Sequence, residues 1–435
     1  MMNVEKKKLA IIGGGMLGLT LAYRLSDRYH ITLFEAQNQI GGLASAWNIN
    51  NIVWDRFYHV ILQSDVHWRS LLRELGLDSQ IQWRQTKTGF YTDRQFYSMS
   101  NTAEFLKFPP LSFIDKCRLG LTIFYASKIT NPQKLEKIPV EKWLTKLSGQ
   151  KTLQKLWKPL LQAKLGEYYH STSAAFIWAT IARMYAARRS GLKKEMFGYL
   201  PGGYARILDV FHQRLSGQGV AIKTGARVQK VEALSNGLLS VTIANRTESF
   251  DKVVSTLPSP LNPLLCPQMP EEEKALHTRI QFLGVVCVSM LVKKSLSPYY
   301  VTNITDDRIP FTGVIEMSSL VDKKEFADHA LVYLPKYVAE DDDIFSTKDE
   351  EIVAEFIQAL KIMHPTMNNQ DIIATRVARA RQVFALPTLN YSHWLPPVTS
   401  GIPGFYTINS AHIVNGTLNV NETIQLANTT IKMIK

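Results

Sequence analysis

The sequence predicts an α/β fold in which a Rossmann-like domain is interleaved with an α+β domain. Three features of the chain support this fold class. A glycine-rich turn lies between two short apolar runs near the start, helical spacing dominates residues 64–199, and strand-like runs return at 220–257 and 284–334. With 46% hydrophobic and 20% charged residues among 435, the chain has the composition of a folded globular protein of two or three domains.

The start of the chain has the pattern of a βαβ unit. Residues 9–12 and 31–34 are short apolar runs that predict buried parallel strands, and helical spacing from Met16 predicts a helix between them. The turn before this helix has the spacing GxGxxG, and the residues that fit it are Gly13, Gly15 and Gly18. Glu35 stands at the end of the second strand. This order of strand, glycine turn, helix, strand and acid is the fingerprint of a dinucleotide-binding site.

Each part of the fingerprint has a physical role. Gly15 has no Cβ, so a pyrophosphate can approach the backbone. The helix that begins near Met16, with Leu17 in its first turn, offers its N–H groups and positive dipole end to the phosphates. Glu35, which Ala36 follows, can accept hydrogen bonds from two ribose hydroxyls. Its negative charge would repel a 2′-phosphate, so NADP is not expected.

The segment after Glu35 narrows the choice of ligand. Gly41 and Gly42 form a second glycine pair shortly after the acid. With the fingerprint, this pair makes the chain resemble the FAD-dependent amine oxidase superfamily, and within it the protoporphyrinogen oxidase and phytoene desaturase branch. An arginine usually follows the pair in the superfamily, whereas this chain has Leu43. The difference favours desaturase-like and mutase-like relatives over true monoamine oxidases, and it weakens the case for an amine substrate.

The resemblance implies that FAD is the cofactor and that its domain has the glutathione-reductase-like fold. It also implies which residues lie against FAD. They are Gly13, Gly15, Met16, Leu17, Gly18, Glu35, Ala36, Gly41, Gly42, Leu43, Val228, Asn409 and Leu418. Asn409 departs from the pattern, because the superfamily commonly has an aspartate there that touches the ribityl or phosphate groups. A last helix from about residue 419 would bring its positive N-terminus to the flavin pyrimidine edge.

The rest of the chain predicts a discontinuous domain organisation. The FAD-binding domain takes residues 1–63, 200–260 and 396–435. The helical part 64–199 and the mixed sheet part 261–395 form the substrate domain. Apolar residues at helical spacing predict helices at 66–75, 112–126, 140–147, 152–165, 171–181, 205–215 and 349–363.

The resemblance also implies that the flavin takes a hydride from the substrate while the protein orients the two. Four residues are catalytic candidates, namely Arg56, His59, Tyr333 and Lys336. For His59 the alternative is a packed or surface histidine, and for Arg56 it is an ion pair with Asp55. No histidine or cysteine has metal-ligand spacing, so no metal is expected. The chain has no second GxGxxG that follows a strand, which argues against a reductase with its own NAD(P)H domain.

The formal net charge of +13 points to an anionic ligand or an anionic membrane surface rather than to nucleic acid, because no nucleic-acid module is recognisable. Residues 119–126, flanked by Lys116, Arg118 and Lys128, could lie in a membrane interface, although a core helix is the favoured interpretation. No run of 18 apolar residues is present, so no spanning helix is expected. Three widely spaced cysteines indicate a reducing compartment, so we expect a cytoplasmic protein, with peripheral membrane contact as the alternative.

The sequence therefore predicts an FAD-dependent oxidoreductase that oxidises or desaturates a hydrophobic or amphipathic small molecule. The electron acceptor stays open, with oxygen and a quinone as candidates. Two alternatives remain. One is a non-redox flavoenzyme similar to UDP-galactopyranose mutase, in which reduced FAD acts as a nucleophile. The other is an FAD-binding protein without catalytic activity.

Overall fold

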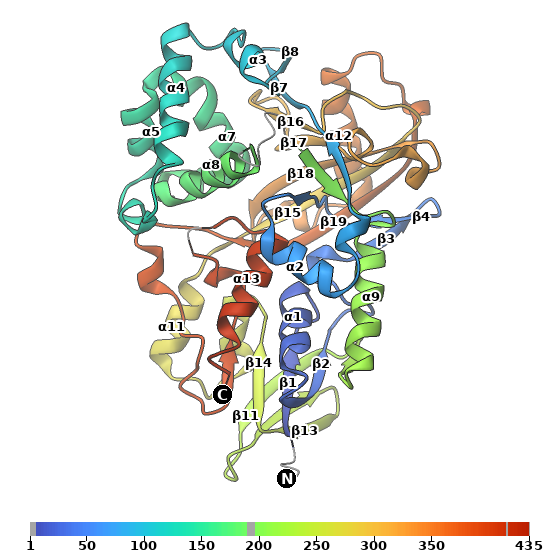
Figure 1. Cartoon of the computed structure of the whole chain (residues 1–435), viewed down its shortest axis with the longest axis vertical. Coiled ribbons are helices and arrows are strands. Elements are labelled where there is room, and N and C mark those ends of the chain that lie inside the picture. Colours follow the sequence, from blue (N-terminus) through green and yellow to red (C-terminus); the bar gives the residue numbers. More distant parts are fainter. Residues whose placement is uncertain (1–5, 189–195, 415, 435) are drawn as a thin grey trace.

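The computed structural model describes residues 6–188, 196–414 and 416–434, and it is an elongated molecule with two strand-rich halves (Figure 1). One half is built on a five-stranded sheet. The other half contains a seven-stranded sheet, and most of the helices from residues 102–188 lie beside it.

The five-stranded sheet is assembled from distant parts of the chain. Its order is β10–β2–β1–β14–β20, and every neighbouring pair is parallel. The strands are β1 (Lys7–Ile12), β2 (Tyr29–Phe34), β10 (Ala221–Lys223), β14 (Lys252–Ser255) and β20 (Phe405–Thr407). The apolar centres of β1 and β14 are fully buried, as expected for a parallel sheet that is covered on both faces.

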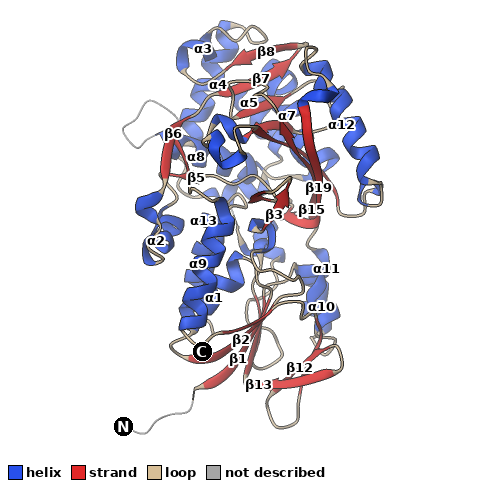
Figure 2. Ribbon diagram, turned by 90° about the vertical axis from the view of Figure 1, so that its right-hand side faces the viewer, coloured by secondary structure: helices blue, strands red, loops and turns tan. Residues whose placement is uncertain are grey.

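Both faces of this sheet are indeed covered. Helices α1 (Met16–Leu25), α9 (Gly203–Gly217) and α13 (Val420–Thr430) pack together on one face. A three-stranded antiparallel sheet covers the other face, together with α10 (Asn262–Leu265), and its strands are β11 (Val228–Ala233), β12 (Leu239–Ile243) and β13 (Arg246–Phe250). Figure 2 shows this small sheet at the lower end of the molecule, with α11 (Glu271–Arg279) above it.

The carboxyl ends of the parallel strands meet at one edge of the sheet, which is where open α/β sheets bind their ligands. Gly13 follows β1, Glu35 follows β2, Thr256 follows β14, and Asn409 lies two residues beyond β20. The topology therefore brings the N-terminal fingerprint and the C-terminal segment to the same edge.

The seven-stranded sheet has the order β19–β15–β18–β17–β16–β7–β8 and is antiparallel except for the pair β7–β16. Its strands are β7 (Thr88–Thr92), β8 (Gln95–Ser98), β15 (Phe282–Val292), β16 (Val301–Ile304), β17 (Gly313–Glu316), β18 (Ala330–Ala339) and β19 (Ile372–Ala385). α12 (Asp349–Met363) packs on one face of this sheet, and the helices between residues 102 and 188 lie on the other.

The segment predicted to be mainly helical also contains strands. β7 and β8 join the large sheet, and a smaller antiparallel sheet combines β5 (Ile61–Leu62), β9 (Met196–Tyr199) and β6 (Gln82–Gln85). β5, β6 and β7 each pair with a strand more than a hundred positions away along the chain, so local spacing gives no signal for that pairing. β8 pairs with β7, its neighbour in the sequence. A two-stranded hairpin, β3 (Ala46–Ile49) and β4 (Ile52–Asp55), leads from the second glycine pair towards the large sheet.

The longer helices of this part overlap the predicted ones, and they are α2 (Val66–Glu74), α4 (Phe113–Ala126), α5 (Val140–Ser148), α7 (Lys158–Leu165) and α8 (Ala174–Arg188). Two short helices, α3 (Thr102–Leu106) and α6 (Gln150–Thr152), have no separate counterpart among the predicted helices. Ser112 caps α4 in a capping box with Asp115, and Pro159 lies in the first turn of α7, where its missing N–H is tolerated. Within the described residues, no helix is long and apolar enough to cross a membrane.

Candidate functional site

The glycine turn joins β1 to α1 at the ligand-binding edge of the parallel sheet. A Cβ on Gly18 would lie 1.9 Å from the carbonyl oxygen of Gly13, so the close approach of helix and strand requires glycine there. Gly15 is the N-cap of α1, and its backbone is extended, a conformation that any residue can adopt. A Cβ on Gly15 would meet nothing within 4 Å, so the space beside it is open. The first turn of α1 holds no acidic side chain. The start of α1 therefore offers open space beside a positive dipole end, as a pyrophosphate requires.

Glu35 is buried against this turn. Its Oε2 accepts a hydrogen bond from the N–H of Gly14 at 2.7 Å, and its Oε1 accepts one from the N–H of Gln37 at 2.7 Å. A Cβ on Gly14 would lie 3.0–3.3 Å from the Glu35 side chain, so the middle glycine makes room for the acid. Each carboxylate oxygen keeps a second lone pair for a ribose hydroxyl. Sequence reasoning missed Gly14, because the GxGxxG pattern leaves that position open.

The second glycine pair packs directly on the first turn. The N–H of Gly41 donates to the carbonyl oxygen of Gly14 at 2.7 Å, and the backbone φ of +112° at Gly41 favours glycine. Gly42 is exposed, and a Cβ there would lie 3.2 Å from the Cα of Gly15. Leu43 is partly buried and packs against the core of the other half. The two glycine segments thus form one continuous backbone surface.

Two buried polar atoms beside this surface have no hydrogen-bond partner among the described residues. They are the Nε of Arg56 and the Oγ of Ser45, and the main-chain N–H of Arg56 donates to the carbonyl oxygen of Ser45. The Arg56 guanidinium lies 5.6 Å from the ring centre of Trp47 and 5.8 Å from that of Phe57, and burial lowers its pKa. A buried donor without an acceptor is costly, so this pair is suited to hold acceptor atoms of a ligand.

The segment from Asp55 to His59 carries a buried acid and a buried base. The N–H of Tyr204 donates to Asp55 Oδ1 at 2.8 Å at the start of α9, while burial raises the pKa of Asp55 to about 7. His59 Nδ1 lies 2.9 Å from the carbonyl oxygen of Phe57 and 4.0 Å from Asp55 Oδ2, and burial lowers the pKa of His59 to about 4. Because a carbonyl only accepts, Nδ1 carries the proton, and neutral His59 keeps Nε2 as an acceptor.

Tyr333 and Lys336 lie on opposite faces of the seven-stranded sheet. Tyr333 is fully buried on the face that meets the helices, and its hydroxyl donates to the carbonyl oxygen of Asp55 at 2.6 Å. Side chains alternate along β18, so Lys336 points towards the α12 face, away from Tyr333 and Tyr337. The structure therefore brings Arg56, His59 and Tyr333 together around Asp55. Lys336, the fourth catalytic candidate, lies on the other face of the sheet and does not share a surface with Tyr333.

The closing segment, which follows β20, lies at the same edge of the parallel sheet. The side chain of Asn409 there forms its hydrogen bonds with other protein groups. Asn409 is buried, its Oδ1 accepts from the N–H of Ala411, and its amide donates to the Oγ of Ser259 at 3.2 Å. Leu418 precedes Asn419, whose side chain caps α13. Val228 begins β11, and the N–H of Ala226 in the same segment donates to the carbonyl oxygen of Glu35, which places this strand beside the acid.

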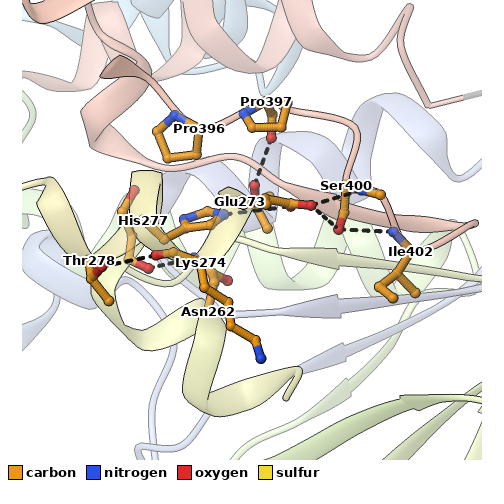
Figure 3. A network of polar contacts seen from close by, with 12 residues as sticks. Asn262, Glu273, Lys274, His277, Thr278, Pro396, Pro397, Ser400 and Ile402 are labelled. Atoms are coloured by element: carbon orange, nitrogen blue, oxygen red, sulfur yellow. Dashed lines mark hydrogen bonds and ion pairs between the residues drawn. The ribbon is translucent and has the colours of Figure 1, made fainter. Parts of the chain in front are cut away.

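A buried acid–histidine pair supports this segment from α11 (Figure 3). Glu273 Oε2 accepts hydrogen bonds from Ser400 Oγ and from the N–H of Gly401, while its Oε1 lies 3.8 Å from Nε2 of His277. His277 is fully buried, and burial with the nearby His412 lowers its pKa to about 4. Neutral His277 thus lies close to His412, in the same segment as Asn409.

A narrow cleft, with a volume of about 20 Å³, lies where the start of α8, the end of β19 and the loop after β20 converge. Most of its walls are apolar, and the lining includes Phe176, Phe384, Tyr391 and Leu418. Two polar atoms in the lining, Oε1 of Glu136 and Oγ of Ser173, are buried without a hydrogen-bond partner among the described residues. The other oxygen of Glu136 accepts from the N–H of Ser392 at 2.9 Å, which holds the carboxylate in place.

A family model described as flavin containing amine oxidoreductase matches residues 17–419. The chain belongs to this family. FAD is its cofactor, and the protein is an FAD-dependent oxidoreductase, which confirms the expectation from the two glycine segments.

Individual relatives show the same likeness. Protoporphyrinogen oxidase 2 of Arabidopsis thaliana is 33% identical over 81 residues, which are 18% of this chain and 16% of that protein. The structure of an oxidoreductase from Methanosarcina mazei is 18% identical, with a TM-score of 0.76 over 98% of this chain and 100% of its own. Reduced UDP-galactopyranose mutase has a TM-score of 0.71 at 14% identity, over 99% of this chain and 94% of its own. At these identities the structural likeness shows the fold, a mixed α/β architecture.

The residues of the site fit FAD. The open space at Gly15 can accommodate a pyrophosphate, and the carboxylate of Glu35 can accept hydrogen bonds from a ribose. The unpartnered Nε of Arg56 is a buried hydrogen-bond donor for the ligand. When bound, the flavin supplies the hydride acceptor of the reaction. The continuous backbone surface of Gly15 and Gly42 would hold the cofactor.

Proposed function

We propose that this FAD-dependent oxidoreductase oxidises or desaturates a hydrophobic or amphipathic small molecule. The narrow cleft beside Leu418 carries this proposal, because its volume of about 20 Å³ admits one small end of a substrate, its walls are mostly apolar, and Glu136 and Ser173 offer two buried polar atoms to a hydroxyl or amino group at that end. Leu418 is also the position that the family resemblance places near the flavin. Oxygen and a quinone are the proposed electron acceptors, and the proposed location is the cytoplasm.

Within this proposal the chain orients its substrate and cofactor and excludes water. Arg56 would donate its Nε to an acceptor atom of the ligand, and neutral His59 would accept a proton or hydrogen bond at Nε2. Asp55 and Tyr333 are positioning residues, because they fix the backbone between Arg56 and His59 through Tyr204 and through the Asp55 carbonyl.

Anaerobic titration of the FAD-loaded protein with candidate substrates tests the proposal. We expect a hydrophobic or amphipathic compound to bleach the visible absorbance of the flavin, and oxygen or a quinone to restore it. Activity that requires reduced flavin but consumes no electrons would instead indicate a mutase-like enzyme. Tight FAD binding with no bleaching by a broad panel would indicate a non-catalytic flavoprotein.

The role of Glu136 can be tested by Glu136→Gln. Glutamine keeps an acceptor for the Ser392 N–H but removes the charge that would strengthen a hydrogen bond from the substrate. We expect KM to rise about tenfold, with kcat nearly unchanged, for the substrate found above. Glu271→Gln, at a carboxylate that is 87% exposed on α11, is the matched control. Equal KM values for the wild type and Glu136→Gln would place the substrate outside the cleft.

A further inference from the structure

Helix α4 is apolar on two opposite faces. Its inward face contains Leu119, Thr122 and Ala126 and packs on α5 and α8. Its outward residues follow at helical spacing and are exposed by half or more of their surface. They are Phe113 at 70%, Ile114 at 71%, Leu121 at 67%, Phe124 at 53% and Tyr125 at 52%, and we call them the outer face of α4. The favoured expectation of a core helix therefore holds for only one side of α4.

This exposure is unusual for a surface helix, whose outward side is ordinarily charged. Between the residues of the outer face lie Cys117 and Gly120, which are also exposed and uncharged. Asp115, the acid of this helix, lies on the inward side, where it forms the capping box with Ser112. The outer face thus carries large apolar and aromatic side chains and no carboxylate.

Positive charge surrounds this face. Residues 101–188 contain fourteen Lys and Arg but five Asp and Glu, an excess of nine in a chain whose net charge is +13. Exposed Arg118 borders the outer face, exposed Lys128 follows its last turn, and exposed Lys107 precedes the helix. Two of the acids in this segment are tied down, because Glu136 is buried and Glu104 accepts hydrogen bonds from Ser98 and Ser100.

We propose that the outer face of α4 docks on an anionic lipid bilayer, with the helix lying in the plane of the interface. Phe, Ile, Leu and Tyr side chains would enter the headgroup and upper acyl region while the surrounding cations meet lipid headgroups. Figure 1 shows α4 at the end of the molecule remote from the five-stranded sheet, so docking there leaves the glycine turn away from the surface. The proposal is independent of the reaction proposed above, because it assumes nothing about the substrate.

Vesicle flotation of the FAD-loaded protein tests this inference. We expect binding to vesicles of phosphatidylcholine with phosphatidylglycerol, weaker binding to phosphatidylcholine alone, and weakening by added salt. The double variant Leu121→Gln/Phe124→Gln should bind at least about tenfold more weakly, because it removes two large apolar side chains from the interface. Leu264→Gln is the matched control, since Leu264 is 72% exposed on α10 in the other half, and it should bind like the wild type.

Three results would overturn the proposal. They are absence of binding to the anionic vesicles, equal binding by the double variant, and self-association through this face without vesicle binding, which sedimentation velocity would detect. Thermal melting and FAD content of each variant show whether the fold is intact. If the double variant does not fold, Leu121→Gln alone provides the same comparison with Leu264→Gln. Because flotation needs no turnover, its outcome is separate from that of the substrate titration.

Discussion

Replacement of Gly15 by valine should abolish stable FAD binding while leaving the fold intact. The backbone at Gly15 is extended, with φ of −73° and ψ of 175°, and the new Cβ meets no protein atom within 4 Å. The side chain would instead occupy the open space at the N-terminus of α1, where the pyrophosphate must approach the N–H groups. We expect the Kd for FAD to rise at least about 100-fold, or ~3 kcal/mol.

Equilibrium dialysis of the apoprotein with FAD measures this effect, and denaturant unfolding of the apoprotein checks the fold. Gly217→Val is the matched control, because a Cβ there also meets nothing within 4 Å but lies at the end of α9. Gly18→Ala makes the contrast, since its Cβ would collide with the Gly13 carbonyl and destabilise the apoprotein itself. Normal FAD affinity in Gly15→Val would show that the pyrophosphate does not pass this turn.

The second large effect is a loss of stability in acid that His277 causes. Its pKa is about 4 in the folded protein and 6.5 in its ordinary state, so between these values the unfolded chain binds a proton that the folded chain does not. Stability from this residue is complete above pH 6.5 and is lost as the pH falls towards 4. The difference amounts to ~3 kcal/mol. In His277→Leu the free energy of unfolding, measured by urea titration across this range, should fall less steeply.

Asp55 provides a control of opposite sign. Burial raises its pKa from 3.8 to about 7, so the folded protein binds the extra proton, and stability from this residue falls as the pH rises from 4 to 7. Asp55→Asn keeps an acceptor for the Tyr204 N–H but has no proton to lose between pH 4 and 7. The free energy of unfolding of this variant should therefore rise more steeply with pH than that of the wild type. Parallel pH profiles for the wild type and both variants would contradict the burial of these two groups.

The sequence predicts most clearly the elements whose signals are local. The βαβ unit of β1, α1 and β2 appears where glycine spacing and short apolar runs place it, and α12 spans residues 349–363 as its helical spacing indicates. β7 escapes prediction because it has five residues and pairs in parallel with β16, more than two hundred positions later. Pairing at that distance depends on tertiary structure, which local periodicity does not encode.

The same distinction applies to the site. The glycine segments and Glu35 can be recognised from their spacing, because their chemistry depends on neighbouring residues. The importance of Asp55 cannot, because it arises from Tyr204 and Tyr333, which are 149 and 278 residues away along the chain. Lys336 fails as a partner of Tyr333 for a simpler reason, since an odd offset along a strand reverses the face. The cleft lining is likewise a product of packing between distant segments.

The three-part assembly of the parallel sheet has a consequence for the biosynthesis of the protein. During translation β1 emerges first, but its neighbour β14 follows only after residue 252, and β20 completes the sheet only after residue 405. A nascent chain that stops in between holds the glycine turn without its C-terminal neighbours, and it exposes the outer edge of β14 to other chains. A cofactor that binds only the finished sheet would stabilise the completed chain over these partial ones by mass action.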